Sequence, residues 1–215
     1  MRKTFIIFIA LFFATFAANS LYAQDTQART LLDAMSNKYK KYNSFRATFT
    51  STLASASENI NESLTGTITV KGNKYHLKTQ GQEIYNDHKT VWTFLDDANE
   101  VTITSYDEAD GLNPTDIFDI YKKDYKYVVV EEVKIGGRVH KVIDLVPEDK
   151  NLQFFKVRLT IDKENYSLAS WNIFEKNGRV HSYKIANFQP NVSVTDTDFQ
   201  FNKTKHPNVE EVDLR

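Results

Sequence analysis

The stretch NSFRATFTSTL, from Asn43 to Leu53, alternates between apolar and polar residues and predicts a strand with two different faces. One face carries Phe45, Phe49 and Leu53, whereas the other carries an arginine and three threonines. A period of two is typical of a strand that buries only one of its faces. The apolar face either packs against a solid core or lines a cavity for an apolar ligand.

The chain begins with the features of a secretory signal peptide. Two basic residues precede an uncharged apolar run over residues 5–18, and SLYAQ follows it. This pattern predicts a signal peptide over residues 1–23 and a single mature domain over residues 24–215, with cleavage after Ser20 as the alternative. The apolar run is shorter than the roughly 20 residues of a membrane-spanning helix, and no later segment approaches that length. We therefore expect an exported, soluble protein.

The composition excludes several classes of site and partner. The 215 residues include no cysteine, which excludes disulfides, thiolate metal sites, a thiol nucleophile and an acylated N-terminal cysteine. Without the signal peptide the chain has 25 basic and 28 acidic side chains, because only two basic residues are removed. Nucleic-acid binding normally shows as a basic excess, so we do not expect nucleic acid as a partner.

Motifs for catalysis or for metal binding are absent from the sequence. The five histidines are scattered without the spacing of metal ligands, and the loop DEADG over residues 107–111 lacks the register of a calcium-binding EF-hand. GxSxG, HExxH, GxGxxG and P-loop sequences do not occur. We therefore expect no metal, no cofactor and no enzymatic activity.

One helix and then a long series of strands are predicted. The helix follows a cap at Asp25 or Thr26, and its apolar residues recur at helical spacing. These residues are Ala28, Leu31, Leu32, Met35 and Tyr39. Strands are predicted at residues 45–54, 64–71, 74–79, 82–86, 90–95, 100–106, 125–133, 138–146, 153–162, 167–174, 180–188 and 199–201. The short Gly- and Asn-containing connections between them indicate antiparallel meanders, because parallel strands need long crossovers.

The segment NPTDIFDIYKK interrupts the strands with a second, short helix. Asn113 is placed to cap it, and Pro114 occupies the first helical position. Its apolar stripe consists of Ile117, Phe118, Ile120 and Tyr121. A helix of about two turns is not stable in isolation, so this segment is expected to dock on the sheet.

Several stretches together resemble the periplasmic outer-membrane lipoprotein carrier family, LolA. They are NSFRATFTSTL, GTITVKG with KYHLKT, DHKTVWTF and NPTDIF, followed by the closing stretches FKVRLTID and SYKIANFQPNVSVTDTDFQF. The resemblance covers nearly all of the mature chain. It implies a mainly β fold, in which a strongly curved antiparallel sheet of about 11 strands forms an unclosed barrel. The N-terminal helix and a short central lid helix would lie on its concave side.

The resemblance also implies a function. The family's role is that of a periplasmic carrier, which takes acylated lipoproteins from an inner-membrane ABC-type release complex and passes them to an outer-membrane acceptor. We expect this chain to act as a monomer. The residues expected to line an acyl-chain cavity are Phe45, Phe49, Leu53, Ile68, Val70, Trp92, Phe94, Ile103, Leu159 and Trp171. The expected lid is formed by Ile117, Phe118, Ile120 and Tyr121.

Three points remain open at this level. Both faces are apolar at Val91 to Leu95, so the inward parity is ambiguous there. Proteobacterial members carry a lid-binding arginine after the strand that resembles GTITVK, whereas this chain has Gly72, so that lid contact is not carried over. The same scaffold could instead serve as a lipid- or lipoprotein-sensing module with a regulatory role. The aromatic residues also have an alternative interpretation, in which they form an ordinary packed core.

Overall fold

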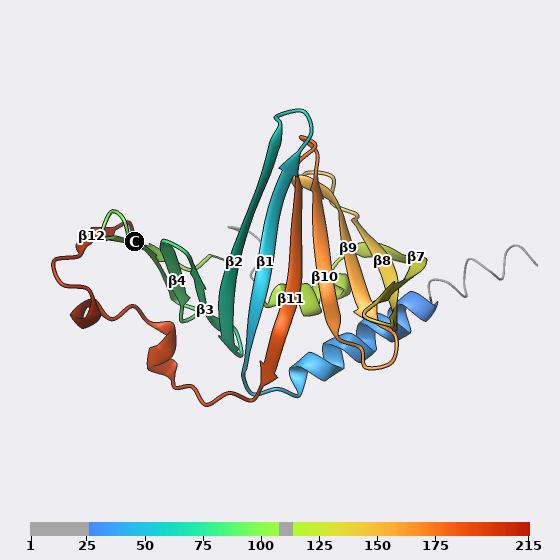
Figure 1. The fold of residues 1–215 in the computed structure, drawn as a ribbon, viewed down its shortest axis with the longest axis horizontal. Helices are drawn as coiled ribbons and strands as arrows, with labels where there is room; N and C mark the ends of the chain where they lie inside the picture. Colours follow the sequence, from blue (N-terminus) through green and yellow to red (C-terminus); the bar gives the residue numbers. More distant parts are fainter. Residues whose placement is uncertain (1–25, 108–113) are drawn as a thin grey trace, which may run out of the picture.

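The computed structural model describes residues 26–107 and 114–215 (Figure 1). The signal peptide predicted at residues 1–23 and the caps predicted at Asp25 and Asn113 lie outside the described residues. A helix over residues 26–40 precedes a single sheet of twelve strands. The strands are β1 (Phe45–Ser55), β2 (Ile60–Lys71), β3 (Lys74–Thr79), β4 (Gln82–Asn86), β5 (Thr90–Leu95), β6 (Glu100–Ser105), β7 (Tyr125–Ile135), β8 (Arg138–Pro147), β9 (Phe154–Asp162), β10 (Leu168–Glu175), β11 (Val180–Pro190) and β12 (Glu210–Asp213).

The sheet is open, with β12 at one edge and β7 at the other. The strand order is β12-β6-β5-β4-β3-β2-β1-β11-β10-β9-β8-β7, so β1 pairs with both β2 and β11 near the middle. All neighbours are antiparallel except β12, which lies parallel to β6. Figure 1 shows the sheet curving, with the N-terminal helix crossing the half that contains β8 and β9. The predicted mainly β, unclosed architecture with an N-terminal helix is confirmed.

Two local predictions are wrong in detail. The strand predicted at residues 199–201 does not form, because Thr195 and Asp198 make a reciprocal capping box that begins the 3-10 turn η4 (Asp196–Phe199). The central helix consists of two separate 3-10 turns, η2 (Asp116–Phe118) and η3 (Ile120–Lys122). Asp119 separates them, with a non-helical φ of −124°.

Strand register determines which residues share a face of the sheet, because directly paired residues in antiparallel strands point to the same side. Starting from Phe45, the pairs lead through Val70, Tyr75 and Asn86 to Val91. We call the side that bears these residues the inner face. The opposite side of the sheet, which bears Arg46 in β1, is the outer face.

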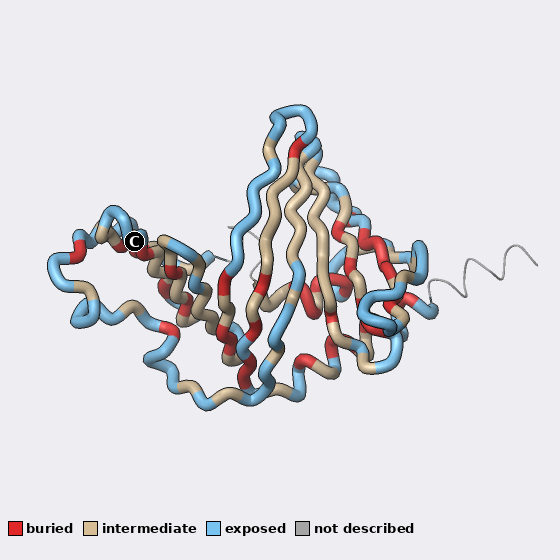
Figure 2. Tube along the Cα trace, viewed as in Figure 1, coloured by how far each residue is buried: buried red, intermediate tan, exposed pale blue. Residues whose placement is uncertain are grey.

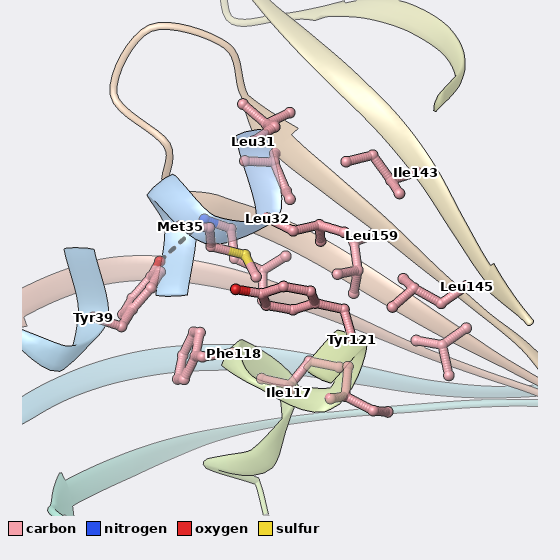
Figure 3. Close-up of a cluster of buried hydrophobic side chains, with 14 of the residues drawn as sticks. Leu31, Leu32, Met35, Tyr39, Ile117, Phe118, Tyr121, Ile143, Leu145 and Leu159 are labelled. Atoms are coloured by element: carbon pink, nitrogen blue, oxygen red, sulfur yellow. Dashed lines mark hydrogen bonds between the residues drawn. The ribbon is translucent and has the colours of Figure 1, made fainter. Parts of the chain in front are cut away.

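The main core lies between the N-terminal helix and the inner face of β8, β9 and β10. Met35 and Leu32 of the helix are fully buried against Ile143, Leu145 and Leu159 (Figure 3). Burying an aliphatic side chain of this size stabilises the fold by about 1.5–3 kcal/mol. Figure 2 shows buried residues concentrated here, whereas the tip of the β1–β2 hairpin is exposed. This packing holds the helix and one half of the sheet together.

A smaller core lies on the outer face. Phe94, Val101 and Ile103 of β5 and β6 pack with Val209 of the C-terminal segment, and Trp92 lies against the same cluster. The chain after β11 therefore crosses to the other edge of the sheet and covers the outer side of β5 and β6 (Figure 1).

Glu83 is the centre of a polar network on the outer face of β3 and β4. Its carboxylate accepts hydrogen bonds from His76 at 2.8 Å, from the Tyr85 hydroxyl at 2.6 Å and from the ammonium group of Lys78. Burial alone would raise the pKa of Glu83, but these three donors lower it from 4.5 to about 2. The ionised form is therefore favoured by the folded state.

We expect Glu83→Gln to lower the free energy of unfolding by about 2 kcal/mol at neutral pH. Because the folded pKa of about 2 lies below the unfolded value of 4.5, this stabilisation is present above pH 4.5 and is lost as the pH falls toward 2. The difference between wild type and variant should shrink over that range in urea titrations. Exposed Glu62→Gln is the control, and a difference that does not vary with pH would contradict the network's role.

Candidate ligand-binding cavity

An apolar cavity of about 180 Å³ lies between the inner face of the sheet and η2. Strands β1, β2, β3, β10 and β11 form its floor, and the segment around η2 forms its roof. Its lining is almost entirely hydrocarbon. The lining residues are Phe45, Ala47, Phe49, Ile68, Leu77, Pro114, Ile117, Phe118, Trp171, Ile173, Tyr183, Ile185 and Phe188.

Six of the residues expected to form the cavity or its lid do line it. They are Phe45, Phe49, Ile68, Ile117, Phe118 and Trp171. Another five belong to the inner-face side of the molecule without lining the cavity. They are Leu53, Val70, Leu159, Ile120 and Tyr121. Of these, Val70, Leu159, Ile120 and Tyr121 are buried in the main core.

The expectation that Trp92, Phe94 and Ile103 share the inward face is wrong. The register that leads from Phe45 to Val91 places these three side chains on the outer face, where the C-terminal segment covers them. Both sides of β5 are apolar because one faces the inner concavity and the other faces that segment. Local periodicity therefore contained no information about which side was inner.

The sequence analysis missed several lining residues on β11 and β3. Tyr183 and Ile185 alternate along β11, so the period-two pattern that identified β1 would also have identified them. Phe188 follows a shift in the β1–β11 register, and it stacks on Phe45 with ring centroids 5.1 Å apart. Leu77 follows from strand pairing, since it lies directly opposite Ile68.

Phe49 reaches its place in the cavity because its neighbour on β2 is a glycine. A Cβ atom added to Gly66 would lie 2.7 Å from Cζ of Phe49 and 2.6 Å from the carbonyl oxygen of Lys78. These distances are too short for any side chain, so the ring of Phe49 lies directly over the β2 backbone. Gly66 thus positions the cavity wall.

The roof is attached to the N-terminal helix by ring stacking. Phe118 stacks on Tyr39 with centroids 3.9 Å apart and an interplanar angle of 20° (Figure 3). The Tyr39 hydroxyl accepts a hydrogen bond from the backbone N–H of Leu168 at 3.1 Å. Burial raises the pKa of Tyr39 to about 12, so this anchor stays neutral at physiological pH.

Asp119, between η2 and η3, joins the roof to the same helix through polar contacts. Its carboxylate accepts a hydrogen bond from Ser36 at 2.5 Å and lies 3.2 Å from the Lys40 ammonium. Lys122 contacts the same carboxylate at 2.5 Å. Burial alone would raise the pKa of Asp119, but the donors Lys122, Ser36 and Lys40 lower it overall. Asp119 is therefore ionised when the roof is in place.

Tyr121 makes a second polar contact with the helix, donating to Asp33 at 2.6 Å. We refer to the contacts of Asp119 and Tyr121 with the helix as the latch. Gly72 has no side chain that reaches the roof, and its φ of +58° suits a turn glycine. Within the described residues, the roof is thus held from the helix side and not from the end of β2.

The structure shows no metal centre and no membrane-spanning helix in the part of the chain that it describes. Within residues 26–107 and 114–215, no three histidine or carboxylate side chains gather in a way that would hold a metal ion. No helix in those ranges combines the length and apolar character needed to cross a bilayer.

Comparison with known proteins identifies the family. The model of the family described as outer membrane lipoprotein carrier protein LolA matches residues 40–202, so the chain belongs to this family and the resemblance seen in the sequence is confirmed. No curated protein sequence matches. The family's scaffold is that of a lipoprotein-binding carrier, and not that of an enzyme family.

Solved structures of similar fold are distant in sequence. An uncharacterized conserved protein from Thermus thermophilus is 13% identical, with a TM-score of 0.57 over 86% of this chain and 98% of that chain. A LolA superfamily protein from Nitrosomonas europaea is 14% identical, with a TM-score of 0.44 over 81% and 97%. A putative outer membrane lipoprotein-sorting protein domain from Vibrio parahaemolyticus is 12% identical, with a TM-score of 0.45 over 82% and 97%. The similarity to the Thermus thermophilus protein shows a shared fold.

Gly66→Ala is expected to destabilise the protein by about 1–3 kcal/mol, because Phe49 or the β2 backbone must move. The same change should alter binding of the neutral fluorescent probe N-phenylnaphthylamine, since Phe49 forms part of the cavity wall. Urea denaturation and probe titration would measure the two effects. Exposed Thr65→Ala on the same strand is the control, and wild-type behaviour of Gly66→Ala would refute the close approach.

The latch predicts that Asp119→Asn combined with Tyr121→Phe loosens the roof. Amide hydrogens of residues 116–122 should exchange faster, because Tyr121→Phe removes a hydrogen bond worth about 0.5–1.5 kcal/mol and Asp119→Asn removes the charge that attracts Lys40. Hydrogen exchange read by mass spectrometry would measure this. Lys126→Gln, which removes an exposed ion pair with Glu148 at 3.9 Å, is the control. Unchanged exchange in the double variant would show that the latch does not hold the roof.

Proposed function

We propose that this protein is a periplasmic carrier that holds the acyl chains of lipoproteins in the inner-face cavity and transfers them from the inner to the outer membrane. The observation that carries the proposal is the apolar cavity itself, which native side chains leave open beneath a small roof. Membership of the lipoprotein carrier family supports the same function. Phe45, Phe49, Ile68 and Trp171 would contact the acyl chain.

The size of the cavity requires the roof to move. An apolar cavity of about 150 Å³ holds a molecule the size of benzene, and sites for larger ligands measure about 300–1,000 Å³. At about 180 Å³ the cavity is smaller than a long acyl chain needs. Ile117 and Phe118 lie above it and belong to short 3-10 turns, so they are the side chains that cargo would displace.

The free energy gained by burying an acyl chain exceeds the cost of opening the roof, but that cost lowers the net affinity. A long acyl chain gains roughly 10 kcal/mol on leaving water. Displacing Ile117 and Phe118 would cost about 1.5–3 kcal/mol each if they became fully exposed, and breaking the latch would cost about 0.5–1.5 kcal/mol per hydrogen bond. Cargo therefore binds, but part of the gain is offset by opening the roof. Re-docking of the roof would then assist release to an acceptor.

The proposed partners follow from this role. An inner-membrane ABC-type release complex would supply acylated lipoproteins, and an outer-membrane acceptor would receive them. We propose that the carrier acts as a monomer, with each chain enclosing its own cargo beneath its own roof.

Filling the cavity provides a test that keeps its surface apolar. Ala47, which is 2% exposed and lines the cavity, can be replaced by leucine. We expect Ala47→Leu to weaken binding of N-phenylnaphthylamine about tenfold while leaving the melting temperature equal or higher, because filling an empty space is commonly neutral or stabilising. Thr50→Leu places the same side chain on the outer face of the same strand as a control. Undiminished probe binding by a folded Ala47→Leu variant would refute ligand binding at this site.

Cargo itself provides the decisive test. The mature protein should form a complex with a triacylated lipoprotein, detected by native mass spectrometry after detergent removal. It should form none with the same polypeptide whose acylated cysteine is replaced by serine. Equal binding of the two polypeptides, or of neither, would refute the proposed carrier function.

A further inference from the structure

A polar cleft of about 250 Å³ lies on the outer face, on the opposite side of β1 from the apolar cavity. Its floor comes from one residue on each of β1, β2, β3 and β4, and its wall is the C-terminal segment between β11 and β12. The floor residues are Arg46, Thr69, His76 and Tyr85. The wall includes Ser193, Thr197, Asp198, Asn202, Lys205 and His206.

Two cationic side chains in this cleft lack a carboxylate partner among the described residues. Arg46 donates from Nε to the Thr69 hydroxyl at 3.1 Å, which leaves its two terminal nitrogens without a described protein partner. Lys205 forms no ion pair within the described part of the chain. Asp198 also lines the cleft, and its Oδ2 atom accepts from the backbone N–H and the hydroxyl of Thr195, at 2.7 and 2.8 Å. Its negative charge also acts on Lys205 and His76, although no ion pair forms with either of these described side chains.

Neighbouring lysines on the same face are neutralised, which sets Arg46 and Lys205 apart. Lys71 and Lys74 both contact Asp196, at 2.8 and 3.0 Å, and Lys78 is paired with Glu83. The two contacts with Asp196 tie the C-terminal segment to the turn between β2 and β3. They build the wall of the cleft without using the charges inside it.

Residues of both the floor and the wall of the cleft are held in place by contacts of their own. His76 stacks on Tyr85 with ring centroids 4.1 Å apart and is hydrogen-bonded to the buried Glu83 at 2.8 Å. Opposite, His206 stacks on Phe201 with centroids 4.8 Å apart. Ordered side chains lose little freedom when a ligand binds, so these aromatic side chains give the cleft a preorganised frame around the exposed Arg46 and Lys205.

We propose that this cleft binds a phosphate group, carried either by a lipid headgroup or by a free phosphate ester. A guanidinium fork and an ammonium group are the side chains that bind phosphate oxygens most strongly in proteins. Hydroxyl groups of Ser193 and Thr197 and the amide of Asn202 supply further donors beside them. This donor number exceeds what the two oxygens of a carboxylate need and suits the three or four oxygens of a phosphate.

The test compares phosphate binding by wild type, by Arg46→Gln combined with Lys205→Gln, and by Lys184→Gln. Lys184 is an exposed lysine on the outer face of β11 that does not line the cleft, so its variant controls for the loss of one positive charge from that face. Inorganic phosphate and glycerol 3-phosphate would be titrated into isotope-labelled protein and followed by the amide resonances of β1, β3 and residues 193–206. A flotation assay would use vesicles of phosphatidylglycerol with phosphatidylcholine, and vesicles of phosphatidylcholine alone.

We expect saturable shifts at the cleft that weaken about tenfold in the double variant and remain unchanged in Lys184→Gln. Binding of the free esters would identify a soluble ligand, whereas cleft-dependent binding of phosphatidylglycerol vesicles alone would identify a headgroup, and both results support the site. The proposal is overturned if wild type shows no shift with any of these probes, or if the double variant binds as well as wild type. N-phenylnaphthylamine titrations of the same variants report on the inner cavity separately, so the two proposals fail independently.

Discussion

The packing of the N-terminal helix against β8, β9 and β10 determines where this molecule is solid and where it is hollow. Leu32 and Met35 are fully buried in the core on that half of the sheet. The helix lies over that half (Figure 1), whereas the inner face of β1, β2 and β11 is covered by the segment around η2. This short segment roofs the concavity without filling it, and a cavity remains beneath Ile117 and Phe118.

The roof contacts the N-terminal helix in two ways, through apolar ring stacking and through polar contacts. Phe118 stacks on Tyr39, and Asp119 accepts from Ser36. Stacking resists separation in water, whereas the polar contacts can be exchanged for hydrogen bonds with water at modest cost. In the proposed carrier function, such a roof would open when an apolar ligand compensates for the burial that opening removes. Gly72, at the end of β2, has no side chain to offer the roof, so the described roof contacts come from the helix.

Strand β1 separates two environments of opposite chemistry. Phe45 and Ala47 line the apolar cavity, while Arg46 between them points into the polar cleft on the other side. The cleft exists because the C-terminal segment returns across the outer face to pair β12 with β6. Without that segment, Arg46 would lie on an open sheet surface, and Trp92 and Phe94 would be exposed to water.

Local sequence patterns determined the N-terminal helix, most strand boundaries and the hairpin turns, because periodicity and turn residues act over a few neighbours. They also identified the apolar face of β1 and the apolar stripe of the roof. Only the tertiary structure decided that Trp92, Phe94 and Ile103 lie on the outer face, since that depends on register transmitted across five strands. The cavity and the cleft also depend on the tertiary structure. Both are formed by residues that lie far apart in the chain, and no local sequence pattern specifies the distances between such residues.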